Sequence, residues 1–274
     1  MWPQRAAANG SMVGGRWVGG GGIKVLHGRL ALAPAQYIGP MSWFWFTNIA
    51  RRIPSRCAVC HAWPSQAVCE ACVNRFAQPC TRCRTCALPL PPGQVQCGAC
   101  IRTLPPWDDA LTAVAYDYPW SQLVVDFKFR QEPGWARSMA LLMRSAPWVE
   151  PALDAADLLV PMPLSRQRLR ERGFNQALLL ARALSAHKTH PRLLMRIKDT
   201  PAQSSLPRSA RLANVQHAFA TDPLRHAELE DRRVVLVDDV MTTGASLGAA
   251  ARSLRRAGAA HITTLVFARA EPGN

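Results

Sequence analysis

The residues best suited to chemistry form one run near the carboxyl end of the chain, Val-Val-Leu-Val-Asp-Asp-Val-Met-Thr-Thr-Gly-Ala-Ser at positions 234–246. The unbroken apolar stretch 234–237 predicts a strand buried on both faces of a parallel sheet. Asp238 and Asp239 would then stand at the carboxyl end of that strand. Five small residues follow and turn into a predicted helix: Thr242, Thr243, Gly244, Ala245 and Ser246.

The start of this helix is a predicted phosphate site. The first amides of a helix have no intrahelical partner and lie at the positive end of its dipole, and the hydroxyls add further donors. Gly244 would let the backbone approach closely. We expect Asp238 and Asp239 to be the catalytic pair, holding the hydroxyls of a ribose 5′-phosphate directly or through Mg²⁺.

Two other interpretations of this run were weighed. The carboxylates could simply cap the following helix, because acidic and hydroxyl residues are common N-caps. A response-regulator receiver domain also has a strand that ends in two Asp residues, but that fold needs several further βα units. Only one helix and one strand fit between Gly244 and the last residue, Asn274, which argues against it.

A second candidate anion site follows another predicted strand. Pro161, Met162 and Pro163 precede four arginines at alternate positions: Arg166, Arg168, Arg170 and Arg172. Arginine grips phosphate oxygens in pairs, so this loop would suit pyrophosphate, with Arg166 and Arg172 as the main candidates. The alternative is a solvated basic helix in which Glu171 pairs locally. Lys128 is a further candidate near the phosphates, or else a surface lysine on a helix.

Nine cysteines lie between Cys57 and Cys100 and none elsewhere, which indicates that they belong to one local structural module. Eight of them form CxxC pairs with the spacing of tetrahedral zinc sites: Cys57, Cys60, Cys69, Cys72, Cys83, Cys86, Cys97 and Cys100. We expect two structural zinc sites in sequence order, with interleaved pairing, an iron–sulfur cluster or disulfides as alternatives. Cys80 makes the count odd and could replace Cys83 or be a free thiol.

Length, composition and charge limit the possible domain organisation and the possible partners. A chain of 274 residues suits one mid-sized domain plus a smaller module, and a net charge of +15 favours phosphate-bearing partners of any kind. The basic residues are nearly all arginine, a bias that high genomic GC content also produces, so charge alone does not indicate DNA binding. The aromatic run 43–46 is too short to span a bilayer, and no export signal is evident.

The elements that must position these residues alternate between strand and helix after Cys100. Strands are predicted at 111–118, 157–160, 193–197, 217–220, 234–237 and 261–268, and helices at 119–129, 135–146, 165–172, 174–185 and 246–256. This order predicts an α/β fold with a parallel sheet flanked by helices. We expect residues 1–40 not to fold or to precede the true start, 41–56 to form a short amphipathic lead-in, 57–106 the zinc module and 107–270 the α/β domain.

The run 234–246 resembles, position for position, the loop of type I phosphoribosyltransferases that binds phosphoribosyl pyrophosphate (PRPP). The whole order of motifs is similar to the ComF family, which is associated with natural competence and with the GntX proteins. The matching segments are 86–90, 97–100, 128–130, 160–164, 172–176, 200–206, Arg211, Asn214, Ala218 and Phe219. Two departures are Ala87, where a glycine is usual, and the extra Cys80.

This resemblance implies a phosphoribosyltransferase-like domain behind a double zinc ribbon. It also implies structural Zn²⁺, Mg²⁺ bound with PRPP, and displacement of pyrophosphate from C1 by a nucleophile, with residues 198–214 as a lid. A cytoplasmic protein assisting DNA uptake, with single-stranded DNA and competence-machinery proteins as partners, is the expected function. The alternatives are an active glycosyltransferase (pentosyltransferase) on a small acceptor and a non-catalytic docking scaffold.

Overall fold

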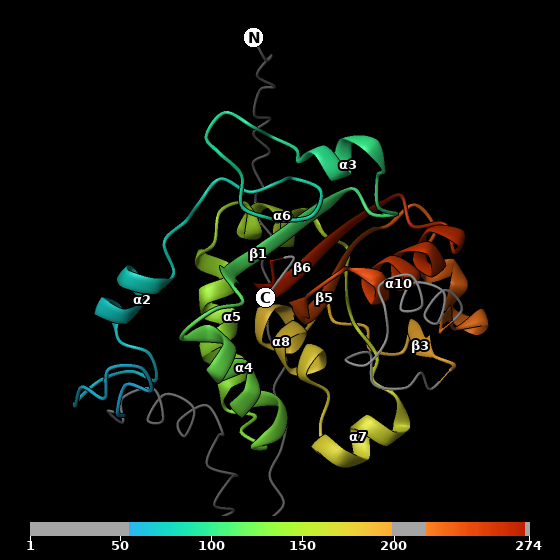
Figure 1. Ribbon diagram of the computed structural model, residues 1–274. Coiled ribbons are helices and arrows are strands. Elements are labelled where there is room, and N and C mark those ends of the chain that lie inside the picture. The colour runs from blue at the N-terminus through green and yellow to red at the C-terminus, as the bar shows by residue number, and fades with distance from the viewer. Residues whose placement is uncertain (1–54, 199–217, 272–274) are drawn as a thin grey trace, which may run out of the picture. The chain divides into compact units, whose positions relative to one another are not determined.

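A computed structural model describes residues 55–198 and 218–271. At its centre is a four-stranded parallel sheet with the order β1-β6-β5-β2 (Figure 1). Its strands are β1 (Asp109–Ala115), β2 (Leu158–Pro161), β5 (Arg233–Met241) and β6 (His261–Arg269). The predicted α/β class with a parallel sheet flanked by helices is confirmed.

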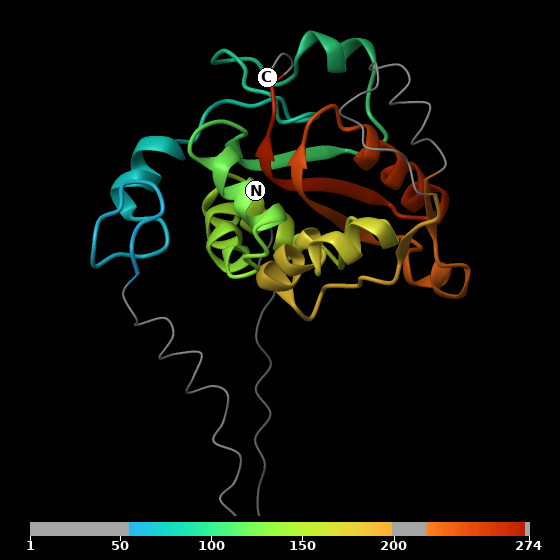
Figure 2. The same ribbon diagram turned by 60° about the horizontal axis from the view of Figure 1, so that its bottom comes forward.

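Helices cover both faces of this sheet (Figure 2). One face carries α4 (Trp120–Phe129), α5 (Trp135–Ser145), α6 (Val149–Ala155) and α8 (Gln176–Ser185), and the other carries α10 (Ala245–Arg256). Along β5, Val234 and Leu236 pack toward α10, whereas Val235 and Val237 pack toward the opposite helices. Successive strand side chains point to opposite faces, so a sheet covered on both sides requires the continuous apolar run that the sequence shows.

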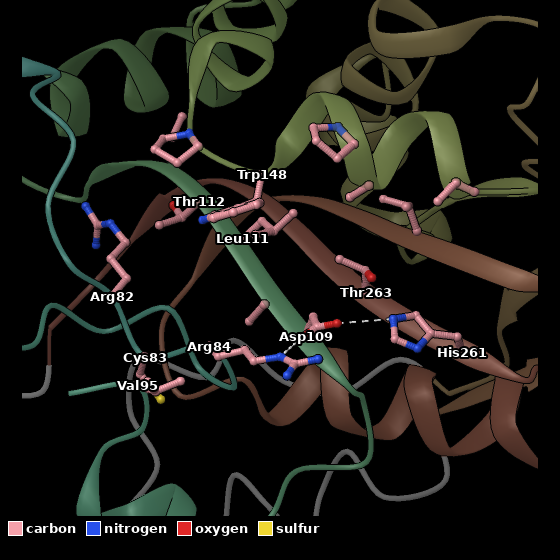
Figure 3. A pocket seen from close by; sticks show the side chains of 18 of the residues that line it. Arg82, Cys83, Arg84, Val95, Asp109, Leu111, Thr112, Trp148, His261 and Thr263 are labelled. Atoms are coloured by element: carbon pink, nitrogen blue, oxygen red, sulfur yellow. Dashed lines mark hydrogen bonds and ion pairs between the residues drawn. The ribbon is translucent and has the colours of Figure 1, made fainter. Parts of the chain in front are cut away.

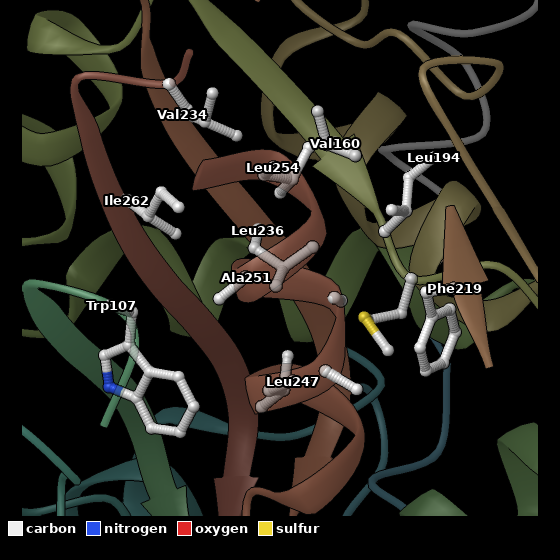
Figure 4. Close-up of a cluster of buried hydrophobic side chains, with 14 of the residues drawn as sticks. Trp107, Val160, Leu194, Phe219, Val234, Leu236, Leu247, Ala251, Leu254 and Ile262 are labelled. Atoms are coloured by element: carbon white, nitrogen blue, oxygen red, sulfur yellow. The ribbon is translucent and has the colours of Figure 1, made fainter. Parts of the chain in front are cut away.

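The packing between α10 and the sheet is built around small residues. Gly248 and the alanines at 249–251 are buried on α10, which lets the helix lie close to the strands. Leu247 and Leu254 of the same helix join Leu236 and Trp107 in this cluster (Figure 4). The cluster therefore holds the first turn of α10, and with it the loop that follows β5, against the sheet.

A separate antiparallel pair lies outside the parallel sheet. It consists of β3 (Leu194–Arg196) and β4 (Phe219–Thr221), which correspond to the predicted strands 193–197 and 217–220. These two strands therefore form a small sheet of their own, in addition to the predicted parallel sheet. Phe219 is buried in the α10 cluster, so the pair is anchored through a side chain and not through strand pairing with the sheet.

Two elements differ from the predicted pattern in a way that matters for the site. Strand β5 runs on to Met241, because β6 continues beside it and pairs Asp238 with Val266 and Met241 with Arg269. The acidic pair thus lies inside the strand and not after it. The helix α6 was not predicted; it begins after Trp148, whose φ of 67° turns the chain sharply.

The remaining described elements are short. They are α2 (Glu70–Phe76) and α3 (Gly98–Arg102) in the cysteine-rich segment, α7 (Arg166–Arg172), and a 3-10 helix, η2 (Pro223–Glu228). The described residues belong to one compact unit. The expectations for residues 1–40, for most of the lead-in 41–56 and for nearly all of the lid 198–214 lie outside the described residues. Among the described helices, none has the length and apolar character needed to cross a membrane.

Candidate functional site

A cavity of about 270 Å³ opens where β5 and β2 end. It is lined by both predicted carboxylates and by the whole predicted phosphate loop, Asp238, Asp239, Thr242, Thr243, Gly244, Ala245 and Ser246. Lys128 on α4 and Met162, Pro163 and Arg172 of the second predicted loop also line it. Residues from four separate segments therefore meet at one edge of the sheet, as expected for parallel strands whose carboxyl ends lie together.

The phosphate loop requires glycine for two reasons. Gly244 has a φ of 76°, a left-handed conformation that side chains disfavour, and it stands directly before α10. A Cβ at this position would lie 3.0 Å from the Cη2 atom of Trp107. The glycine thus serves packing against Trp107 behind the loop, in addition to the close approach to a ligand that the sequence suggested.

The residues of the loop line the cavity. The Ala245 amide donates to the Thr243 hydroxyl at 3.3 Å, a long bond that stays within the loop. Among the described residues, no group accepts from the amides of Thr243 or Gly244. The start of α10, a helix of 12 residues, therefore keeps amides for an anion.

The two carboxylates differ in their surroundings. Asp239 is 6% exposed and forms an ion pair with Lys128, whose Nζ lies 2.9 Å from its Oδ1 atom. Asp238 is partly exposed and accepts a hydrogen bond from the Asp239 amide. Burial, together with the neighbouring Asp239 charge, raises the pKa of Asp238 to about 7, although Lys128 and Arg172 act in the opposite direction. Near neutral pH the Asp238 carboxyl group is therefore present in both its charged and its neutral form.

Arg172 is held at the cavity by its neighbours. Its guanidinium lies 5.2 Å from the centre of the Phe129 ring and donates to Gln176 Oε1 at 3.1 Å. Burial lowers the pKa of Arg172 from its usual value, while the carboxylates of Asp239 and Asp238 favour its charged form. A guanidinium remains protonated in proteins, so Arg172 brings a fixed positive charge to the site.

Gln176 is a cavity residue that the sequence analysis did not name as a candidate. The segment 172–176 carries part of the family resemblance, but Arg172 is its only residue that the sequence analysis names as a candidate. Gln176 is 1% exposed, lines the cavity, and its Nε2 donor has no partner among the described residues. An unpaired buried donor is costly, so a ligand oxygen at this point would satisfy it.

Asn175 of the same turn fixes the second loop. Its Nδ2 donates to the Met162 carbonyl at 3.0 Å, and its Oδ1 accepts from the Leu178 amide as the N-cap of α8. Gly173, with a φ of 78°, caps the end of α7 two residues before Asn175. The asparagine therefore ties the Pro-Met-Pro loop to the helix that carries Gln176.

The structure corrects the choice of arginines. Arg168, and not Arg166, lines the cavity together with Arg172. Residues four apart share one face of a helix, so α7 turns Arg168 and Arg172 inward and leaves Arg166 exposed. Pro161 is paired with Val237 inside the sheet and does not line the cavity either. Glu171 accepts a hydrogen bond from Gln167, one turn earlier in the same helix, at 2.8 Å.

A larger hollow of about 820 Å³ lies elsewhere, between the cysteine-rich segment, β1 and α6 (Figure 3). Its lining includes the amino-terminal residues of β5 and β6, at the opposite ends of the strands from the phosphate loop. Asp109 in its wall contacts both Arg84 and His261. Unlike the smaller cavity, it gathers no set of donors toward one point, and we assign the functional site to the smaller one.

The eight predicted cysteines form two groups in sequence order, 57/60/69/72 and 83/86/97/100, and within each group the sulfurs lie within 4.8 Å of one another. Three Sγ–Sγ distances are 3.5, 3.7 and 3.9 Å, for Cys60–Cys69, Cys86–Cys97 and Cys57–Cys72. A tetrahedral ion with sulfur bonds of about 2.3 Å separates its ligands by roughly 3.8 Å, so each group could hold a metal ion. Cys80 is exposed and belongs to neither group.

The turns around these cysteines favour metal binding. The amides of Cys69 and Cys97 each donate to a cysteine sulfur at 3.4 Å, on Cys57 and Cys83 respectively. Burial acts against ionisation, but amide hydrogen bonds outweigh it and lower the pKa of Cys57 to about 6, whereas burial and the neighbouring cysteines raise the pKa of Cys72 in the same group to about 12. Ala87, which replaces the usual glycine, has a φ of 58°, so it adopts the left-handed conformation that a glycine would provide.

The raised pKa of Asp238 predicts how stability depends on pH. Because its pKa is higher in the folded protein than the ordinary value of 3.8, the folded state binds this proton more tightly, and stability falls as pH rises through about 7. Asp238→Asn should therefore be more stable than wild type at pH about 8, with the difference shrinking toward pH about 5. Thermal unfolding across this range measures it, with the exposed Asp154→Asn as control. An Asp238→Asn difference that does not vary with pH would contradict the expectation.

Comparison with known proteins agrees with this geometry. Residues 177–273 match the family described as "Phosphoribosyl transferase domain". The chain is 36% identical over 174 residues to Competence protein F of Haemophilus influenzae, covering 61% of this chain and 75% of that protein. It is 30% identical over 226 residues to DNA utilization protein YhgH of Escherichia coli, covering 79% and 98%. With Competence protein ComFC of Bacillus subtilis it shares 40% identity over 117 residues, 42% of this chain and 46% of that protein. Given this coverage, the parallel sheet and the cysteine-rich segment, the chain belongs to the ComF family of the type I phosphoribosyltransferase superfamily.

Proposed function

We propose that the small cavity binds PRPP or a closely related phosphosugar, and that the protein uses this site in the handling of DNA. The observation that carries the proposal is the meeting of the loop amides, two carboxylates, Lys128, Arg172 and an unpaired Gln176 donor around one 270 Å³ space. Its volume lies just below the range of about 300–1,000 Å³ that is usual for small-molecule sites. A compact, highly charged ligand suits such a space.

In this proposal each group has a distinct role. The amides of Thr243 and Gly244 take the 5′-phosphate, and Asp238 and Asp239 take the ribose hydroxyls. Mg²⁺, when bound with the ligand, would be held by these carboxylates and phosphate oxygens and would neutralise pyrophosphate charge. Arg172 grips pyrophosphate oxygens, and Gln176 Nε2 donates to one more. Lys128, which pairs with Asp239 and lines the cavity, adds a positive charge beside the phosphates.

The same arrangement supports a transferase reaction. Displacement of pyrophosphate from C1 of the ribose builds positive charge on the ring and negative charge on the leaving group. The carboxylates would stabilise the ring and the cations the leaving group, without a residue that must accept a proton from the sugar. The acceptor remains open in this proposal. A docking scaffold, the other alternative, does not account for the unpaired donor of Gln176 at the cavity wall.

We further propose that both cysteine groups hold structural zinc and that the protein works in the cytoplasm. Zinc prefers four thiolates in a tetrahedron, and the sulfur spacing supports that geometry. Clustered free thiols also suit a reducing compartment.

A role with DNA is supported by the relatives and by one surface. The relatives are named for competence and for DNA utilization. Next to the cavity, α7 has the sequence Arg-Gln-Arg-Leu-Arg-Glu-Arg, with Arg166 and Arg170 exposed. We propose that these arginines hold the backbone of single-stranded DNA while the cavity holds a phosphorylated sugar.

Binding of PRPP with Mg²⁺ should be measurable by calorimetry and as thermal stabilisation, worth about 2.7 kcal/mol at a ligand concentration 100 times Kd. Arg172→Ala should weaken binding by roughly 1.5–3 kcal/mol, because a charged hydrogen bond is lost. Asp238→Asn combined with Asp239→Asn should weaken it at least as much. Arg166→Ala, on the outer face of the same helix, is the matched control and should change little. Absence of any binding by wild type at millimolar ligand would remove the proposal.

Metal analysis tests the zinc proposal and the position of Cys80. Elemental analysis of the purified protein should find two zinc ions per chain. Cys83→Ser should lose one of them, whereas Cys80→Ser should keep both, because Cys80 lies outside both sulfur groups. Loss of zinc from Cys80→Ser, or full zinc in Cys83→Ser, would show a different ligand set.

Salt dependence tests the DNA surface. The logarithm of the binding constant for a short single-stranded oligonucleotide should fall linearly with the logarithm of salt concentration, by about 0.7 per phosphate contact. Arg166→Gln with Arg170→Gln should reduce this slope by about 1.4. Arg256→Gln, an equally exposed arginine at the far end of α10, should leave the slope unchanged. Equal slopes for the double variant and wild type would place DNA elsewhere.

A further inference from the structure

One indole joins the second cysteine group to the phosphate loop. The Trp107 Nε1 atom donates to the carbonyl of Thr85 at 2.6 Å, and Thr85 lies within the turn Cys83–Cys86. The ring of the same tryptophan, 7% exposed, packs directly behind Gly244 and also lies 3.6 Å from where a Cβ of Gly248 would be. A displacement of the cysteine turn would therefore move the surface on which the loop rests.

A buried arginine makes a second, independent link. Arg269, the last residue of β6, is 5% exposed, and its Nε donates to the carbonyl of Cys86 at 2.7 Å. Its Nη1 donates to the carbonyl of Met241 at 3.0 Å and to that of Thr242. The guanidinium thus bridges a cysteine of the second group and the two residues that open the phosphate loop. Charged hydrogen bonds to buried carbonyls are among the stronger ones. A shift of the Cys86 carbonyl would therefore also shift Met241 and Thr242.

The first cysteine group has no comparable link. Its nearest polar connection to the α/β fold is the bond from Trp120 Nε1 to the carbonyl of Phe76, at 2.8 Å. Cys57 and Cys72 pack in the cluster formed with α4 and α5, on the sheet face opposite α10. Within the described ranges, no hydrogen bond connects this group to residues 241–246. The two groups are alike in chemistry but differ in what they contact.

We propose that the second cysteine group positions the phosphate loop, so that metal at Cys83, Cys86, Cys97 and Cys100 and ligand at the loop favour each other's binding. This inference rests on the proposed function of the cavity. A metal ion fixes both ends of the turn 83–86 and thereby the carbonyls of Thr85 and Cys86. Trp107 and Arg269 are then positioning residues that carry this constraint to Met241, Thr242 and Gly244. Metal at the first group has no such effect.

Coupling between two sites is reciprocal, so it can be measured from either side. Couplings of this kind typically change affinity by about 5- to 150-fold. Cys97→Ser, which removes a ligand of the second group, should weaken PRPP binding by at least about 5-fold. Cys60→Ser, which removes a ligand of the first group, should change it less than about twofold.

The reverse measurement follows zinc release to a chelating dye. Saturating PRPP with Mg²⁺ should slow the release phase that belongs to the second group and leave the other phase unchanged. The two single-cysteine variants assign the phases. Trp107→Phe keeps an aromatic side chain but removes both the bond to Thr85 and the indole atoms that pack behind Gly244, and it should retain two zinc ions while losing most of the ligand's effect on release. A purely structural tryptophan would change stability but not this effect, and an unchanged effect would overturn its role.

Arg269→Lys, which keeps the charge, should preserve part of the coupling, and Arg269→Met should not.

Hydrogen exchange provides a readout that needs no ligand. Amides of residues 241–246 should exchange faster in Cys97→Ser and in Trp107→Phe than in wild type, and at the wild-type rate in Cys60→Ser. Equal exchange in all of these proteins would overturn the inference. If wild type binds no PRPP but the loop still loosens in Cys97→Ser, the proposed function fails while the positioning role stands.

Discussion

The parallel pairing of β5 with β2 and β6 is the constraint on which the rest of this structure depends. It aligns the carboxyl ends of three strands, so the loops after β2 and β5 open at the same edge of the sheet. Because β6 accompanies β5 as far as Met241, the two aspartates are held by strand geometry and not by a flexible loop. The phosphate loop begins directly afterwards, with α10 pressed onto the sheet by its small residues. A site on rigid elements of this kind keeps its groups in place before any ligand arrives.

That pre-organisation has a cost in stability. The cavity brings Asp238 and Asp239 together where they are largely shielded from solvent, which raises the pKa of Asp238 to about 7. It also partly buries the charges of Lys128 and Arg172 beside them. It also leaves a glutamine donor unpaired. None of these features helps a protein to fold, and all of them suit a ligand that carries phosphates, hydroxyls and a divalent cation. Strained or unsatisfied groups gathered at one place are the usual mark of a functional site.

The cysteine-rich segment gives the fold a second means of fixing the loop. Its two groups repeat the same spacing, yet one packs beside α4 while the other reaches the phosphate loop through Trp107 and Arg269. Repetition of a motif along a chain therefore does not imply repetition of its role. The physical difference lies in the carbonyl groups next to the cysteines, because only those near Cys83 and Cys86 accept hydrogen bonds from side chains that also touch the loop within the described residues.

The sequence by itself determined the features that depend on local order: the acidic pair and loop of 234–246, the two sets of CxxC pairs and the alternation of strands and helices. Each follows from residue type and spacing along one segment. Only the tertiary structure decided which distant residues join them. The pairing of Lys128 with Asp239, the choice of Arg168 over Arg166, the unpaired Gln176 and the bridges made by Trp107 and Arg269 all arise between segments far apart in the chain. Sequence spacing carries no information about such contacts, because they are set by how helices pack on the sheet and by which face each helix turns inward.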